Sequence, residues 1–179
     1  MSCRIVKICI SLLAATALTG EVAAQSKSLG SLWSFSGIGI SYEHRTDNDT
    51  FAEISLKAEM GEVYFGRANI PGCSAAFTWN IVFKSWQSKN GNRIDLFGGP
   101  GAIAGWANDY FEDTGVFFGM KGRIGVECTF SRKITISACL SPIIGSHAIL
   151  LDESVKMHFY RYGLMNALFP EIGIRYSFR

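Results

Sequence analysis

The residues of this 179-residue chain that are best suited to catalysis are few, and most of them lie close together in the sequence. A hydrolase needs a nucleophile, a base and an orienting acid within hydrogen-bond reach. Ser146-His147, followed by Asp152-Glu153, offers all three residue types. Adjacent Ser and His are common by chance, and a catalytic motif requires its structural context. We therefore prefer a polar loop here and predict no catalytic residue. The chain has three histidines in all: His44, His147 and His158.

A second group of reactive residues consists of charged side chains that share one face of alternating segments. An ion pathway would favour an excess of one sign, whereas buried charges of both signs must pair. Acidic and basic residues are nearly equal in number in this group, which predicts a network inside the protein in which the charges pair with one another. The expected members are Glu53, Lys57, Glu59, Lys84, Arg93, Asp95, Lys121, Arg123, Glu127, Glu171 and Arg175.

No metal site or cofactor is predicted. The glycine cluster Gly98-Gly99-Pro100-Gly101 lacks the Gly-Lys-Ser/Thr that completes a phosphate loop. Glycines at this density are more typical of close strand packing.

The segments that must position the charged residues are β-strands. Apolar and polar residues alternate over Val116–Phe130 and again over Ile134–Ser141. A period of two indicates strands with one apolar and one polar face. Tilted membrane-spanning strands are about 9–11 residues long, which these segments approach or exceed.

The alternation also predicts how these two strands pair. Directly opposed residues must lie on the same side of a sheet. A two-residue turn would oppose Phe130 to Lys133, whereas a three-residue turn, Ser131 to Lys133, opposes Phe130 to Ile134. We expect the three-residue turn, with Cys128 opposite Ile136 and Glu127 opposite Ser137. Cys128 and Cys139 then lie on opposite faces and should not bond to each other.

Similar alternation gives eight candidate strands in all. Asn48-Asp49 and Asn90-Gly91-Asn92 are turn signals between them. Eight strands form about the smallest barrel that side chains can fill without an open channel. The other six candidates are Gly37–Glu43, Ala52–Glu59, Phe77–Lys84, Arg93–Trp106, Val155–Tyr162 and Leu168–Phe178.

The N-terminus has the pattern of a secretory signal peptide. Arg4 and Lys7 precede an apolar stretch, Ile8–Leu18, that is too short to span a bilayer. Small residues at Val22-Ala23-Ala24 predict cleavage after residue 24, which leaves a single domain over residues 25–179.

The composition of the chain excludes some function classes. Its 17 Lys and Arg against 15 Asp and Glu give no basic footprint for nucleic acid. Three cysteines remain after residue 24, and an odd number cannot form a complete disulfide framework. Whether any two of them form a disulfide stays open.

The two faces of the strands separate a membrane barrel from a soluble one. A lipocalin-like barrel is apolar inside and polar outside, and alternation alone does not say which face points inward. Here the apolar face is large, aromatic and nearly free of charge, whereas the polar face is crowded with Gly, Ser and Thr. Such faces favour a transmembrane barrel with its apolar face outward. Some of the tryptophans would then lie in the interfacial girdles: Trp33, Trp79, Trp86 and Trp106.

Two segments resemble the small OmpX/OmpA-type outer-membrane barrels of Gram-negative bacteria. The C-terminal segment Pro170–Phe178 resembles their closing strand, which ends in an aromatic residue, and Gly119–Phe130 resembles one of their wall strands. The resemblance implies a closed antiparallel barrel in the cell outer membrane, with Tyr176 and Phe178 as the signal that the insertion machinery recognises. Arg179 extends one residue beyond this pattern.

One feature departs from that family. Its barrels begin and end in the periplasm, with short periplasmic turns and longer external loops. With the eight candidate strands, the odd-numbered connections should be the external ones, yet they include the short connections 46–49, 87–91 and 131–133. Either the count is wrong by one strand, with Val155–Tyr162 the first suspect, or the external loops are short.

Two classes of function follow. The first is a structural, adhesion or envelope-integrity barrel whose lumen is filled by paired charges. The second is a narrow porin or a lipid-handling barrel, including a lipid A-modifying hydrolase, although the His-x-Ser spacing of the lipid A deacylases is absent. The expected partners are outer-membrane lipid and the insertion machinery, with no nucleic acid, and the expected state is a monomer.

Overall fold

The computed structural model describes residues 26–47, 49–64, 66, 70–88, 91–109, 114–130, 133–151, 154–165 and 168–178. The predicted signal peptide, residues 1–24, lies outside the described residues. In the described part of the chain, no helix has the length and apolar character needed to cross a membrane.

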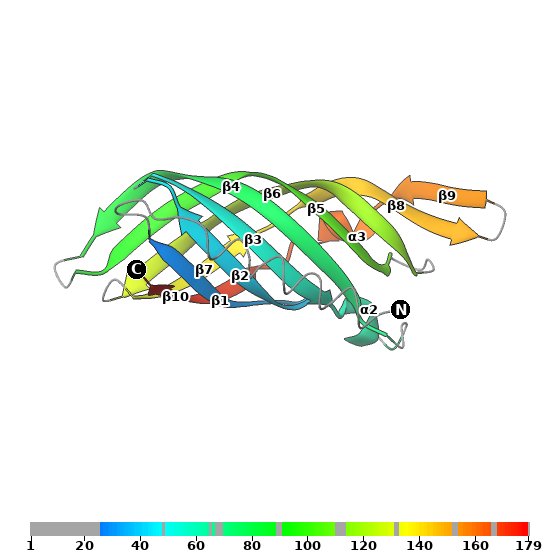
Figure 1. Cartoon of the computed structure of the whole chain (residues 1–179), viewed down its shortest axis with the longest axis horizontal. Helices are drawn as coiled ribbons and strands as arrows, with labels where there is room; N and C mark the ends of the chain where they lie inside the picture. Colours follow the sequence, from blue (N-terminus) through cyan, green and yellow to red (C-terminus); the bar gives the residue numbers. More distant parts are fainter. Residues whose placement is uncertain are drawn as a thin grey trace.

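The fold is a closed antiparallel barrel whose wall has eight strand positions (Figure 1). Seven of these positions are single strands, and β7 and β8 follow one another in the remaining one. Two short helices lie in the connections: α2 (Gly61–Tyr64) and α3 (Arg161–Met165). The strands are β1 (Lys27–Ser34), β2 (Gly37–Arg45), β3 (Thr50–Glu59), β4 (Gly72–Gln87), β5 (Arg93–Asn108), β6 (Thr114–Phe130), β7 (Ile134–Leu140), β8 (Ile143–Leu151), β9 (Ser154–Phe159) and β10 (Glu171–Phe178).

The barrel closes between its first and last strands. β1 pairs with β10, with Lys27 opposite Phe178 and Trp33 opposite Ile172. The remaining neighbours are consecutive hairpins up to β6, and β6 pairs in turn with β7 and β8. β7 pairs with the second half of β6 and β8 with the first half, because the chain breaks its ladder at Ser141-Pro142. Proline has no backbone N–H to donate to a ladder.

The predicted hairpin register between β6 and β7 is confirmed. Phe130 is opposite Ile134, Cys128 opposite Ile136 and Glu127 opposite Ser137. The cysteines at 73, 128 and 139 are free. Period-two alternation is therefore sufficient to fix this part of the sheet.

The strand count from the sequence is wrong at two places. β1 was not predicted, because Leu32 is apolar on the inward face and Ser31 is polar on the outward face, which blurs the alternation. Val155–Tyr162 was predicted as a wall strand, but β9 pairs with β8 alone and forms a hairpin that projects beyond the barrel (Figure 1). The last strand begins at Glu171 rather than Leu168.

The corrected count resolves the conflict over the loops. With β1 included, the short connections 46–49, 88–92 and 131–133 are the second, fourth and sixth. They lie at the same end of the barrel as Lys27 and Phe178. The longest connections, 60–71 and 152–170, lie at the opposite end, where β1 and β2 are joined by two residues and β5 and β6 by the five residues 109–113. Short turns at one end and the longest connections at the other are typical of outer-membrane barrels.

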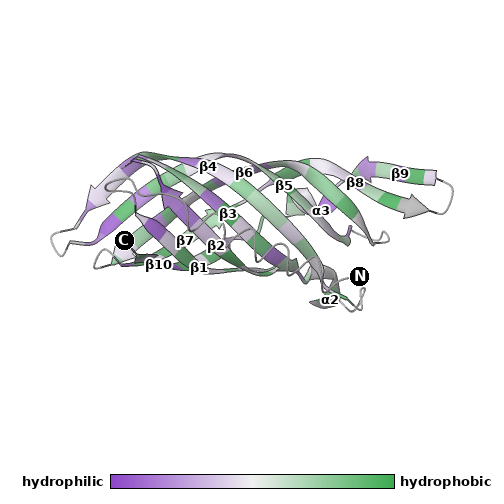
Figure 2. Ribbon diagram, in the orientation of Figure 1, coloured by the Kyte–Doolittle hydropathy of each residue, from purple (hydrophilic) through white to green (hydrophobic). Residues whose placement is uncertain are grey.

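The outer face of the barrel is apolar and the inner face is polar. Hydrophobic and hydrophilic positions alternate along the strands (Figure 2). Ile136 and Ile174, which oppose each other on β7 and β10, are 43% and 54% exposed, whereas Arg123 and Glu127 are 4% and 1% exposed. A soluble protein does not expose an apolar face of this size. The pattern is that of a transmembrane barrel of the outer membrane.

The aromatic residues of the outer face fit the two edges of a bilayer. All four tryptophans are exposed on the outer face. Trp33 and Trp106 lie near strand ends at the end of the barrel that carries the longest connections, and Trp86 lies near the short connection that follows β4. Tyr176 and Phe178, the predicted insertion signal, are exposed at the end of β10.

Candidate functional site

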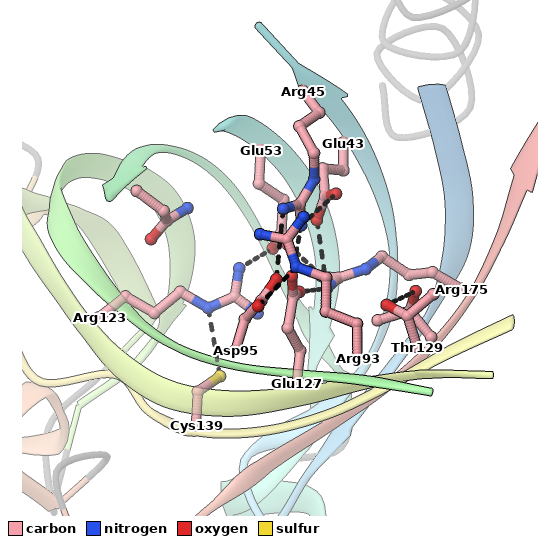
Figure 3. A network of polar contacts seen from close by, with 12 residues as sticks. Glu43, Arg45, Glu53, Arg93, Asp95, Arg123, Glu127, Thr129, Cys139 and Arg175 are labelled. Carbon is pink, nitrogen blue, oxygen red and sulfur yellow. Dashed lines mark hydrogen bonds and ion pairs between the residues drawn. The ribbon is translucent and has the colours of Figure 1, made fainter. Parts of the chain in front are cut away.

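Arg175 is the central residue of a network of charged side chains in the barrel lumen (Figure 3). It lies on β10 and is 1% exposed. Its Nη1 donates to Oε2 of Glu53 at 2.7 Å, and its Nη2 donates to Oε2 of Glu127 at 2.6 Å. The same Nη2 lies 3.1 Å from Oε2 of Glu43. One guanidinium thus joins β10 to three other strands, β2, β3 and β6.

Arg123, on β6, forms the second centre of the network. Its Nη1 pairs with Glu53, so that this carboxylate lies between two guanidinium groups. Its Nη2 lies 3.8 Å from Oε1 of Glu171, which also pairs with Lys121 at 3.9 Å. Its Nε donates to Sγ of Cys139 at 3.2 Å. Arg123 therefore connects the central glutamates to the first residue of β10.

Arg45 extends the network toward the end of the barrel where the short connections lie. It pairs with Glu127, and its guanidinium lies 3.4 Å from Glu43 and 3.5 Å from Asp95. Asp95 also accepts hydrogen bonds from Nε of Arg93 at 2.7 Å and from the Ser85 hydroxyl at 2.6 Å. The Asp95 side chain is only 2% exposed, and its carboxylate is paired with two arginines and hydrogen-bonded to a serine.

The ten residues of this network, which we call the lumen network, balance in charge. Ion pairs connect all ten without a gap. Removing a charge from water is costly unless it is paired and hydrogen-bonded, and here each carboxylate contacts at least one cation. The five acids are Glu43, Glu53, Asp95, Glu127 and Glu171, and the five bases are Arg45, Arg93, Lys121, Arg123 and Arg175.

Two of the predicted lumen residues form a separate pair. Lys57 lies 3.2 Å from Glu59 and donates to the Ser36 hydroxyl at 2.8 Å, while Ser74 donates to Glu59 at 2.6 Å. This pair lies at the end of β3 that leads into the long connection 60–71. Among the described residues, no ion pair joins it to the lumen network.

The prediction of an inward Lys84 is wrong. The β4–β5 register shifts between Val82 and Lys84, so that Val82 is opposite Phe97 and Lys84 is opposite Leu96. A bulge adds one residue to a strand and reverses the parity beyond it. Lys84 is exposed, and its Nζ lies over the ring of Trp86 at 5.2 Å from the centroid.

Sequence reasoning missed Glu43, Arg45 and Cys139 as members of this site. The alternation places Glu43 on the polar face of its strand, and Arg45 is the next residue of the same parity. Extending the lumen set by these two residues would have found both. Cys139 alternates as an inward residue, but nothing in its residue type indicates an arginine partner.

The lumen also holds small polar residues, such as Ser41, Thr78 and Ser137, and two clusters of apolar side chains. One apolar cluster lies in the lumen toward the long connections, and in it the rings of Phe117 and Tyr160 are stacked with 4.5 Å between their centroids. Two pockets near that end have volumes of about 20 and 10 Å³, which is room for about one water each. The cluster consists of Ala76, Ile103, Ala107, Phe117, Ile143 and Tyr160.

The side chains of Ser146 and His147, the pair that suggested a hydrolase, do not lie together as a catalytic pair. Ser146 and His147 are consecutive on β8 and therefore point to opposite faces of the sheet. His147 is completely buried, and its Nε2 lies 2.9 Å from the carbonyl oxygen of Ala107. The acids at 152 and 153 lie outside the described residues.

The comparisons with known proteins find the fold but no sequence relative. No family model matches the chain, and no curated protein matches it. Among solved structures, the chain is similar to the N-terminal β-barrel domain of Pseudomonas aeruginosa OprF, with 11% identity, coverage of 86% of this chain and 97% of that one, and a TM-score of 0.46.

Two further structures are similar over most of the chain. A major outer membrane protein from Thermus thermophilus has 9% identity, coverage of 87% and 100%, and a TM-score of 0.47. Ail, the attachment invasion locus protein of Yersinia pestis, has 13% identity, coverage of 86% and 97%, and a TM-score of 0.39. The fold predicted from the sequence, a closed antiparallel barrel of eight strands, is the fold observed in the described residues.

Proposed function

We propose that this protein is a non-conducting outer-membrane barrel with a structural, envelope-integrity role. Its lumen network blocks the passage of ions through the lumen and holds the strands in register, and the protein performs no catalysis. The observation that carries the proposal is Arg175, a completely buried cation that bridges three glutamates across the lumen. A water-filled channel needs solvated charges, whereas the side chains of Arg175, Arg123 and Glu127 are all 0% exposed.

Apolar packing in the lumen also disfavours a narrow porin. Phe51, Val82 and Phe97 are buried in a cluster that contacts the lumen network, and the cluster around Phe117 is buried toward the long connections. Arg45 lies over the Phe51 ring at 4.9 Å and Arg123 over the Phe97 ring at 5.4 Å. Cation–π contacts of this kind add to the packing of a desolvated guanidinium.

The orientation follows from the lengths of the connections. Short turns are periplasmic in barrels of this type and long loops are external. We therefore place Lys27 and Phe178 at the periplasmic edge and the β8–β9 hairpin on the outside. This hairpin exposes Val155 and Met157 beyond the barrel wall and is the surface that we expect an external partner to contact.

Planar-bilayer recording tests the proposal. Wild-type protein should give almost no conductance at a protein density at which a general porin gives frequent insertions and open channels. The variant Arg175→Ala with Glu53→Ala keeps the charge balance and removes two side chains from the lumen, so it should conduct more than wild type. Lys84→Ala is the matched control, because Lys84 lies outside the lumen, and it should remain closed. A steady, ion-selective current through wild-type protein contradicts the proposal and favours a narrow porin.

A further inference from the structure

We propose that Asp109, His147 and His158 form a binding site for a divalent transition-metal ion, with Zn²⁺ as the representative. Asp109 directly follows β5, and His147 and His158 lie on β8 and β9, at the end of the barrel opposite the connections 46–49, 88–92 and 131–133. One potential ligand atom from each lies within 4.8 Å of the other two. Two imidazoles and a carboxylate form a donor set that suits zinc and similar ions.

The hydrogen bond of His147 prepares this residue for metal binding. A backbone carbonyl can only accept, so the 2.9 Å contact between Nε2 and the Ala107 oxygen places the ring proton on Nε2. Nδ1 then carries a lone pair, and this atom is buried without a hydrogen-bond partner among the described residues. Metal-binding histidines commonly donate their other ring N–H to a carbonyl or carboxylate in this way.

The other two residues are already spaced as ligands of one ion. Nε2 of His158 lies 3.3 Å from Oδ2 of Asp109. Two ligands that are each about 2.0–2.1 Å from a tetrahedral zinc ion stand about 3.3 Å apart. His147 and His158 are directly opposed on β8 and β9, and their ring centroids are 5.0 Å apart. Three protein ligands leave a fourth position for water in a tetrahedral zinc site.

The surroundings hold this group of residues in place. Asp109 is completely buried and accepts hydrogen bonds from the backbone N–H groups of Arg161 and Tyr162, both at 3.0 Å. Gly115 leaves room for the imidazole, because a Cβ there would lie 2.7 Å from Cε1 of His147. A bound ion would therefore tie the projecting β8–β9 hairpin, in which β9 pairs with β8 alone, to the end of β5.

Zinc titration of the protein, extracted from membranes in detergent without a histidine tag and treated with a chelator, tests this site. In competition with a chromophoric chelator, wild type should bind one Zn²⁺ per chain. His158→Gln and Asp109→Asn should each weaken binding at least about tenfold, by analogy with the loss that even outer-shell changes cause. His158 is partly exposed, so its replacement is not expected to disturb folding.

His44→Gln is the matched control, because His44 lies on β2 near the opposite end of the barrel. It should leave the affinity unchanged. Co²⁺ should give the visible absorption of a tetrahedral site in wild type and in His44→Gln, but not in His158→Gln. The site is refuted if wild type binds no zinc, if His44→Gln weakens binding as much as His158→Gln does, or if a variant lacking both His147 and His158 keeps the full affinity.

Discussion

Replacing Arg175 by methionine should destabilise the barrel more than any other single loss of charge. Methionine has a similar length and fills much of the same volume, so the main effect is electrostatic. Arg175 contacts Glu43, Glu53 and Glu127 within 3.1 Å. Its removal leaves five buried carboxylates against four cations, since the lumen network is balanced in the wild-type protein.

The size of this effect follows from the contacts that remain. Breaking a buried pair by removing one partner costs about 3–5 kcal/mol. Arg123 still pairs with Glu53, and Arg45 still pairs with Glu43 and Glu127. We therefore expect the lower end of the range, about 3 kcal/mol, or roughly a 100-fold shift of the folding equilibrium.

Urea titration in lipid vesicles, followed by tryptophan fluorescence, measures this change in the free energy of unfolding. Adding Glu53→Gln to Arg175→Met restores the charge balance, so the double variant should lose less than the sum of the two single losses. Lys84→Met is the control for losing a cation outside the lumen and should change stability by less than about 0.5 kcal/mol. A loss below about 1 kcal/mol for Arg175→Met, or strict additivity in the double variant, would refute a dry lumen network.

Three other predictions test the facing and the packing of the wall. Ile136→Arg puts a charge on the lipid face and should cost about 2–4 kcal/mol if the position is near the midplane, while Ile136→Leu should stay within about 1.5 kcal/mol in the same titration. A variant that keeps Cys139 as its only cysteine should react with a maleimide after unfolding but not in the folded barrel, since Cys139 is 3% exposed. Rapid labelling of the folded form would argue for an open lumen. A Cβ at position 99 would lie 1.8 Å from a carbonyl oxygen of β4, whereas a Cβ at position 122 would lie 3.3 Å from its nearest atom. Gly99→Ala should therefore destabilise the barrel more than Gly122→Ala does. Equal effects would contradict the close approach of β4 and β5.

The parts of the fold that sequence reasoning could predict are those that depend on local periodicity. The β6–β7 register followed from parity alone, because a shift by one residue would have placed Lys133 opposite Phe130. β1 escaped the same reasoning, since Leu32 packs into the lumen while Ser31 faces outward. β9 shows genuine alternation, but alternation cannot distinguish a wall strand from the arm of a projecting hairpin.

The membership of the lumen network was predictable in part, and its pairings were not. Parity places Glu53, Arg123 and Glu127 on the inner face of their strands. Which of them meet depends on strand tilt and on closure between β1 and β10, and these are properties of the whole sheet. Lys84 shows the other limit, because a bulge reverses parity without a clear mark in the sequence.

The lumen network also bears on how one pairing of the strands is selected. β6 carries Lys121, Arg123 and Glu127 on its inner face and Met120, Ile124 and Val126 on its outer face. A register slip of one residue would move all three charges to the lipid side, at about 2–4 kcal/mol for each Lys or Arg near the midplane and less for the Glu. The same slip would take both cations of the lumen network away from Glu171, and Glu53 and Arg175 would each lose one partner. If the lumen were apolar instead, the displaced side chains would be tolerated by lipid, and the slip would cost much less. We infer that the charges contribute more to the uniqueness of the strand pairing than to the net stability of the barrel, since a buried ion pair by itself stabilises a fold little.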